Sequence, residues 1–116
     1  MNSNETNRGM DRCDQPYAIT VLFEVKSETY SHFLNLIREN AATSVRDEPD
    51  CIRFDVLTPA ADSGAFHIFL YEIYQSRAAF DLHLETDHFK FFDTATRDLI
   101  LAKTVNQYYV TENIKS

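Results

Sequence analysis

Glycine and proline are scarce in this sequence, with 2 and 3 residues respectively among 116. An all-β chain with many tight turns, or a linker-rich disordered chain, needs more of both residue types, so both classes are disfavoured. The chain length and the apolar content of 44% suit one domain built around one hydrophobic core.

Long apolar runs are missing as well. No segment approaches the roughly 20 apolar residues that a membrane-spanning helix needs, and the N-terminal residues MNSNETNRGMDRCDQ contain no apolar run that could act as a secretion signal. The net charge is −7, and Lys and Arg are scattered rather than clustered. Since such a surface repels phosphate backbones and anionic lipids, we expect a cytoplasmic protein that binds neither nucleic acid nor membranes.

Cysteine is nearly absent too, and the two cysteines form neither a CxxC pair nor a disulfide framework. Cys13 lies in the polar N-terminal segment and Cys51 at the start of an expected strand, and both are expected to be reduced. A thiol becomes nucleophilic when a neighbouring base or dipole lowers its pKa, and no such group stands beside Cys51 in the sequence. We therefore interpret Cys51 as a buried packing residue.

Apolar periodicity begins after a polar segment. Residues 1–15 are expected to form a disordered tail, and residues 16–116 the folded domain. The segment YAITVLFEV alternates apolar with smaller or more polar side chains and predicts a strand. Ser27 is the expected N-cap of a helix that runs to about residue 45. The predicted buried stripe of this helix is Tyr30, Phe33, Leu34, Ile37, Ala41 and Val45.

The middle of the chain predicts a hairpin. Pro49 ends the first helix because it pushes Glu48 out of the helical region. CIRFDVL then predicts a strand with Ile52, Phe54 and Val56 on one side, and TPAADSG predicts a turn. The strand that follows, AFHIFLYEIY, is apolar on both faces, which is typical of a central strand buried on two sides.

Two helices and a strand complete the chain. Ser76 and Asp87 are the expected N-caps of helices in RAAFDLHLE and HFKFFDTATRDLILA, and TVNQYYVTE predicts the last strand. The expected inward face of the last helix is Phe89, Phe92, Thr96 and Leu99. The order β-α-β-β-α(α)-β predicts an α+β, ferredoxin-like fold, with helices on one face of a four-stranded antiparallel sheet. Because the other face would leave apolar side chains in water, we expect a second copy to cover it.

The segments ENAATSV, EPDCIRFDVL, FLYEIY and AFDLHLETDHF together resemble the antibiotic biosynthesis monooxygenase family, over roughly residues 17–110. Residues 39–57 are most similar to the isomerase of autoinducer-2 breakdown, and the rest is similar to the quinol monooxygenases. The resemblance implies a homodimeric α+β barrel with a pocket between sheet and helices, and no metal, flavin or haem. The haem-degrading branch uses a Trp, which this sequence lacks.

Three polar residues are the candidate catalytic groups. Asn40 and Ser44 follow the buried stripe of the first helix. The resemblance places Asn40 at the pocket, as a donor to a substrate oxygen, and Ser44 is a candidate substrate-binding residue. The alternative for Asn40 is an amide at the helix edge bonded to water or a loop. His83 and His88 converge on one cavity if the chain breaks near Thr86, and either suits proton transfer at neutral pH. The alternative for each is a structural histidine bonded to a carbonyl.

Charged and aromatic side chains are the candidate substrate-binding residues. Glu72 lies in the central strand, where it needs a partner; Arg53 is the candidate, and a structural ion pair, with Asp55 in the same network, competes with a functional role. The candidate aromatic wall of the pocket is Phe54, Phe69, Tyr71, Phe89 and Tyr108, and core packing is the alternative for each.

Three functions are compatible with these residues. The first is oxygenation of a small phenolic or quinol-type substrate without a cofactor, with His83 or His88 as base and Asn40 as hydrogen-bond donor. The second is isomerisation of a small, phosphorylated or free hydroxy-dione, in which Arg53 or Lys90 would hold a phosphate. The third is non-catalytic binding of a small molecule by a dimer.

Overall fold

The computed structural model describes residues 15–61 and 66–112. The predicted tail with Cys13, and part of the predicted turn after residue 57, lie outside these residues. The elements run in the order β1 (Tyr17–Val25), η1 (Ser27–Thr29), α2 (Tyr30–Asp47), β2 (Cys51–Leu57), β3 (His67–Tyr74), α3 (Arg77–His83), α4 (Asp87–Thr96), η2 (Arg97–Leu99) and β4 (Ile100–Tyr109).

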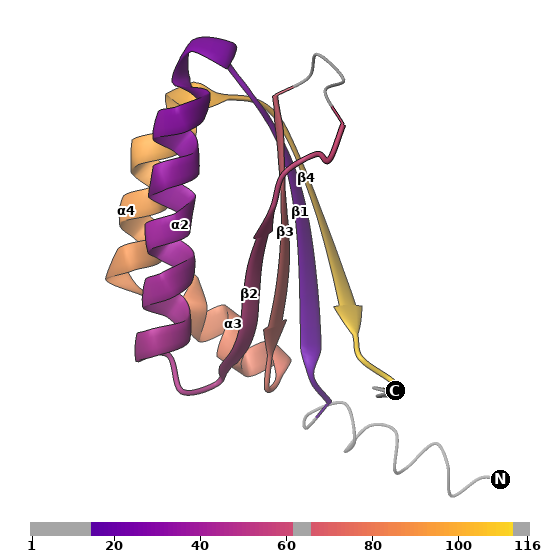
Figure 1. Cartoon of the computed structure of the whole chain (residues 1–116). Coiled ribbons are helices and arrows are strands. Elements are labelled where there is room, and N and C mark those ends of the chain that lie inside the picture. The colour runs from indigo at the N-terminus through magenta and orange to yellow at the C-terminus, as the bar shows by residue number, and fades with distance from the viewer. Residues whose placement is uncertain (1–14, 62–65, 113–116) are drawn as a thin grey trace, which may run out of the picture.

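The strands form one antiparallel sheet in the order β2-β3-β1-β4, and helices α2, α3 and α4 cover one of its faces (Figure 1). In the register, Val21 of β1 lies opposite Leu70 of β3 and Val105 of β4. The expected α+β, ferredoxin-like fold is confirmed. No helix of the described residues is long and apolar enough to cross a membrane.

The core lies between the helices and the covered face of the sheet. Phe23 of β1 packs edge-to-face on Phe33 of α2, with ring centroids 4.9 Å apart, and Phe33 packs in the same way on Phe92 of α4, at 5.7 Å. Because side chains alternate along β1 and β3, every second residue reaches this core. The buried positions of these two strands include Ile19, Val21, Phe23, Ile68, Leu70 and Tyr74.

The first helix differs from its prediction at both ends. Ser27 makes no capping hydrogen bond and belongs to η1, and α2 begins at Tyr30. Val45 is 49% exposed, and the buried side of the helix continues through Asn40 and Ser44 instead. Position 44 lies seven residues after Ile37, which brings it back to nearly the same side of a helix, whereas position 45 is rotated by about another 100°.

The later elements are partly as predicted. The Ser76 hydroxyl caps α3 by accepting from the Ala79 N–H, which confirms that prediction. Asp87 is not the cap of α4, because the Thr86 hydroxyl accepts the Phe89 N–H at 3.2 Å. The last strand begins at Ile100, four residues earlier than expected, because Ile100 pairs with Val25 in the sheet. Pairing between strands thus overrides the helical pattern of residues 100–102.

Strand β2 contains one irregularity. Cys51 lies opposite Tyr74, and the register shifts between Cys51 and Arg53. The extra residue is Ile52, which is 48% exposed, so the prediction that it shares a face with Phe54 and Val56 is wrong. A bulge of this kind turns one side chain out of the alternation.

Candidate active site

A cavity of about 330 Å³ lies between the sheet and the helices. Its size is in the range of pockets that enclose small organic molecules. All four strands contribute to its floor, and α3 and α4 supply aromatic side chains from the opposite side. The apolar lining includes Ile19, Val21, Phe54, Leu70, Phe80, Phe89 and Phe92; the buried polar residues in the lining are Asn40, Glu72, His83 and Thr96.

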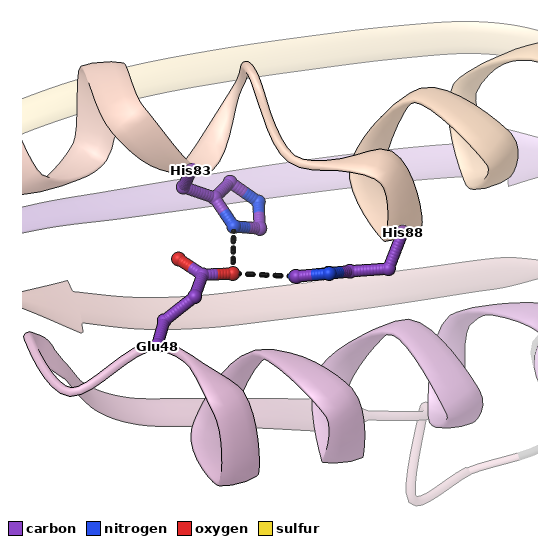
Figure 2. A group of neighbouring side chains, drawn as sticks. All are labelled: Glu48, His83 and His88. Carbon is purple, nitrogen blue, oxygen red and sulfur yellow. Dashed lines mark hydrogen bonds and ion pairs between the residues drawn. The ribbon is translucent and has the colours of Figure 1, made fainter.

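Three titratable side chains, of which His83 lines this cavity, meet at one carboxylate oxygen (Figure 2), and we call them the Glu48 cluster: Glu48, His83 and His88. His83 Nδ1 lies 2.8 Å from Glu48 Oε2, and His88 Nε2 lies 2.5 Å from the same oxygen. His83 is buried and lines the cavity, whereas His88 is partly exposed and lines a neighbouring outer groove. The cluster therefore links the cavity wall to the outside of the domain.

Local backbone chemistry brings these three residues together. Glu48 follows α2 with an extended backbone, directly before Pro49, and its N–H bonds the Ser44 carbonyl. Thr86 builds the turn between α3 and α4: its N–H and its hydroxyl both donate to the His83 carbonyl, at 3.1 and 2.7 Å. The sequence interpretation found the histidines but missed Glu48. The signal that could have found it is a carboxylate placed where Pro49 ends the helix.

The protonation of His83 follows from its surroundings. Burial lowers its pKa below the usual value, and the neighbouring Glu48 carboxylate opposes this shift only in part. The imidazole is therefore neutral at neutral pH. Since a carboxylate can only accept, His83 Nδ1–H donates to Glu48, and His83 Nε2 is left with a free lone pair. A neutral imidazole in this tautomer is a competent proton acceptor.

Glu72 is a carboxyl group buried in the central strand at the cavity floor, with 4% of its surface exposed. The Tyr74 hydroxyl donates to Glu72 Oε1 at 2.6 Å. Burial raises the pKa of Glu72 to about 7, and the Tyr74 hydrogen bond limits the rise. Arg53 is not its partner: Arg53 bonds Asp55 at 2.6 Å. The reason is strand parity, because Phe54 lies opposite Glu72 and the neighbouring Arg53 points to the other face.

Asn40 lies on the buried side of α2 and lines both the cavity and the outer groove. Among the described residues, its Oδ1 is a buried polar atom without a hydrogen-bond partner. Ser44 is fully buried, and its hydroxyl donates to the Asn40 backbone carbonyl at 2.8 Å. Ser44 does not line the cavity, so its predicted contact with substrate is wrong for this cavity; it satisfies the helix backbone instead.

The family model named antibiotic biosynthesis monooxygenase matches residues 16–94. The chain belongs to this family. The resemblance seen in the sequence is thus confirmed for the family as a whole, and the match names neither the quinol monooxygenase nor the isomerase branch.

Individual relatives agree with this assignment. A solved structure from Nitrosomonas europaea, named as a candidate antibiotic biosynthesis monooxygenase, is 28% identical with a TM-score of 0.77, covering 84% of this chain and 92% of its own. A structure from Caulobacter crescentus shares the fold, with 19% identity, a TM-score of 0.78, and coverage of 91% and 99%. The uncharacterized protein sll1783 of Synechocystis sp. is 29% identical over 75% of this chain, which spans 57% of that protein's length.

In this member of the family, two of the five aromatic residues predicted to line the cavity do so. Phe54 and Phe89 line the cavity. Phe69, Tyr71 and Tyr108 do not, so their predicted place in its wall is wrong for this cavity. They lie on the uncovered face of the sheet, where Tyr108 is 51% exposed, because their positions alternate with cavity-facing neighbours such as Leu70 and Glu72. Arg53 lies over the Tyr71 ring on that same face, 5.8 Å from its centroid.

The geometry also bears on two other chemistries, a nucleophilic cysteine and a metal site. Burial, assisted by Glu48 and Glu72, raises the pKa of Cys51 to about 12, so its thiol is not a nucleophile at neutral pH. The Glu48 cluster has the donor types that a metal ion needs, with its ligand atoms within 4.8 Å of one another. Ligands around a tetrahedral ion lie roughly 3.4 Å apart, given bonds of about 2.1 Å. The 2.5 and 2.8 Å separations fit direct hydrogen bonds better.

Proposed function

We propose that this protein is a cofactor-independent monooxygenase that oxidises a small phenolic or quinol-type substrate with molecular oxygen. The observation that carries the proposal is His83 in the wall of an apolar cavity, with Nδ1 held by Glu48 and Nε2 free. Membership of the antibiotic biosynthesis monooxygenase family supports the same reaction class. The cytoplasmic location expected from the sequence is part of this proposal.

The chemistry begins with a proton transfer. His83 Nε2 takes the proton of a substrate hydroxyl, and the Glu48 carboxylate stabilises the imidazolium that forms. The substrate anion then transfers an electron to oxygen, and the two radicals combine into a ring-bound peroxide. Loss of water from this peroxide leaves the oxidised product, so a phenol and one oxygen molecule give a quinone and one water. The apolar lining excludes bulk water from the anion.

The roles of the two histidines separate in this mechanism. His83 is the base because it faces the cavity, whereas His88 holds the opposite side of the same carboxylate oxygen and faces the outer groove. We assign His88 a positioning role: it fixes Glu48, which in turn fixes the His83 ring. Of the two imidazoles that the sequence leaves open, we therefore propose His83 as the base.

Asn40 orients the substrate in this proposal. The sequence-based hypothesis makes its amide a donor to a substrate oxygen. The atom without a partner among the described residues is Oδ1, which is an acceptor. A substrate hydroxyl that donates to Asn40 Oδ1 would satisfy this buried atom, so we propose that Asn40 recognises a second hydroxyl of the substrate, one that His83 does not deprotonate.

The proposal is tested by oxygen consumption with a panel of phenols and quinols, after subtraction of the non-enzymatic rate. We expect consumption with at least one substrate and formation of the corresponding quinone. Proton exchange into a hydroxy-dione under nitrogen, without oxygen uptake, would establish the isomerase instead. That alternative has lost its expected phosphate ligands, because Arg53 pairs with Asp55 and Lys90 with Glu85, both outside the cavity. Binding without turnover of either class would establish a binding protein.

We also propose that the protein is a homodimer joined through the uncovered face of the sheet. Large apolar side chains on this face are partly exposed in the single chain: Leu22 at 40%, Leu57 at 44%, Phe69 at 37% and Tyr108 at 51%. Patches of this kind on a sheet are typical of a protein interface. A second copy would cover these side chains.

A further inference from the structure

Glu72 is a buried titratable group that the steps above leave unused. It lies in the covered face of the sheet between apolar neighbours, opposite Ile19 on one side and Phe54 on the other. Among the described residues, the hydrogen bond to its carboxyl group comes from the Tyr74 hydroxyl and occupies Oε1. Oε2 is thus available to a molecule in the cavity that Glu72 lines. A carboxyl group kept at such a place without a cation bonded to it is expensive for the fold.

The proposed reaction contains a second proton transfer that His83 does not explain. In the ring-bound hydroperoxide, the carbon that carries the peroxide also carries a hydrogen. The carbonyl forms when this carbon loses its proton and the O–O bond breaks, with both electrons of that bond leaving on the outer oxygen as hydroxide. The hydroxide becomes water by taking up one proton. One group that accepts the first proton and donates the second completes this step without any further reactant.

We infer that Glu72 is a second acid–base residue of the cavity, which carries the proton from the ring carbon to the departing oxygen. This inference rests on the proposed monooxygenase function and adds a residue to it. The Tyr74 hydrogen bond holds Oε1, so the transfer uses Oε2. Since the carboxylate is regenerated when water forms, the group ends each cycle as it began, and the atoms and charges balance.

The electrostatic surroundings of Glu72 suit both halves of this transfer. Burial raises its pKa to about 7, so both protonation states are accessible at neutral pH. Tyr74 and Lys103 favour the carboxylate, and Glu48 disfavours it. The other titratable side chains on this side of the sheet include Cys51 and Tyr17, which both lie opposite Tyr74, and His83 and Asp93 in the cavity wall. His83 is neutral at this pH because burial lowers its pKa.

The test uses hydroquinone as the probe and compares the wild type with Glu72→Gln and Glu72→Asp. For Glu72→Gln we expect kcat to fall about 100-fold or more, with KM changed less than threefold. The peroxide should then be lost as hydrogen peroxide, leaving unhydroxylated quinone, so the ratio of hydrogen peroxide to hydroxyquinone rises. Glu72→Asp keeps the carboxyl group and should recover part of kcat. Circular dichroism checks that each variant is folded.

The pH profile separates an acid–base role from a packing role. Because the Tyr74 hydrogen bond lowers the pKa of Glu72, Tyr74→Phe should move the ascending limb of kcat to higher pH. Wild-type kcat and product ratio in Glu72→Gln would overturn this inference and leave the proposed function standing. Absence of oxygen uptake by the wild type across the whole substrate panel would overturn the proposed function, and this inference with it.

Discussion

The two faces of the sheet carry different kinds of side chain, and on each face some of these side chains are of the kind that its surroundings disfavour. The polar side chains Asn40, Glu72 and His83 are buried between the covered face and the helices, whereas the uncovered face presents Leu22, Phe69 and other apolar side chains to water. Buried polar groups and exposed apolar patches are both costly in a lone subunit. The difference leads us to propose a partner for each face: a small molecule inside the cavity, and a second copy of the chain on the uncovered face.

Strand β3 shows the contrast within a single element. Glu72 points to the cavity, and its neighbours Tyr71 and Ile73 point to the uncovered face. One strand in the middle of the sheet therefore serves both the candidate site and the proposed interface. A register slip of one residue would exchange the two sets of side chains, so the pairing with β1 and β2 has to be unique.

The largest expected effect comes from the covered face. His83→Gln removes the proposed base, and we expect kcat/KM for oxygen consumption to fall by about 10²–10⁴-fold. The matched control is His32→Gln, because His32 is an exposed histidine on α2. It should retain wild-type activity. Full activity in His83→Gln would show that His83 is not the base, and it would overturn the catalytic role proposed for the covered face.

The corresponding change on the uncovered face is the double variant Leu22→Glu, Phe69→Glu. These residues lie opposite each other in neighbouring strands, so in a dimer four carboxylates would meet, at a cost of several kcal/mol. We expect analytical ultracentrifugation to show a monomer. Leu82→Glu, which alters a residue of α3 that is 67% exposed, is the control and should stay dimeric. A monomeric wild type would refute the proposed interface.

A third test measures how much the buried carboxyl group of Glu72 lowers the free energy of unfolding. Glu72 has a pKa of about 7 in the folded state and 4.5 in the reference state, so the folded protein binds the proton more tightly. The free energy of unfolding of the protein should therefore fall as pH rises from about 4.5 to about 7. Glu72→Gln removes this loss. We expect the variant to gain on the order of 3 kcal/mol over the wild type at pH 8 and nearly nothing at pH 4, by urea unfolding.

The smallest effect concerns the turn that brings the two histidines to one carboxylate. Thr86→Ala removes the N-cap of α4 and should lower the free energy of unfolding by about 1 kcal/mol. Thr86→Ser keeps the hydroxyl and should retain most of that stability. If Thr86→Ala also lowers kcat more than Thr86→Ser does, the turn positions His83 and His88 as well as stabilising the helix.

Much of the fold could be predicted because its periodicities are strong. The alternation in YAITVLFEV predicted a strand, and the apolar content of AFHIFLYEIY on both faces predicted a strand inside the sheet, where β3 lies. The errors fell where tertiary pairing competes with local pattern. Ile52 sits in a bulge, Ile100 joins the sheet rather than the helix, and Thr86 caps α4 in place of Asp87.

The candidate site was predictable in its residue types and much less so in its contacts. Local sequence placed Asn40, His83 and His88 near the ends and buried sides of helices, and it placed Glu72 in the central strand. It could not indicate that Glu48 bonds both imidazoles, since Glu48 lies 35 residues before His83 and 40 residues before His88. It also assigned Phe69, Tyr71 and Tyr108 to the cavity, which required knowing the side of the sheet that the helices cover.

The sequence by itself determined the order of the elements, the alternation of the strands and the presence of an apolar sheet, because these depend on neighbours a few residues apart. Only the tertiary structure decided which face each strand residue takes, that Arg53 pairs with Asp55 rather than Glu72, and that one carboxylate joins two histidines. Such contacts depend on strand register and on how helices cross the sheet. Both are set by packing across the whole domain, which no local pattern encodes.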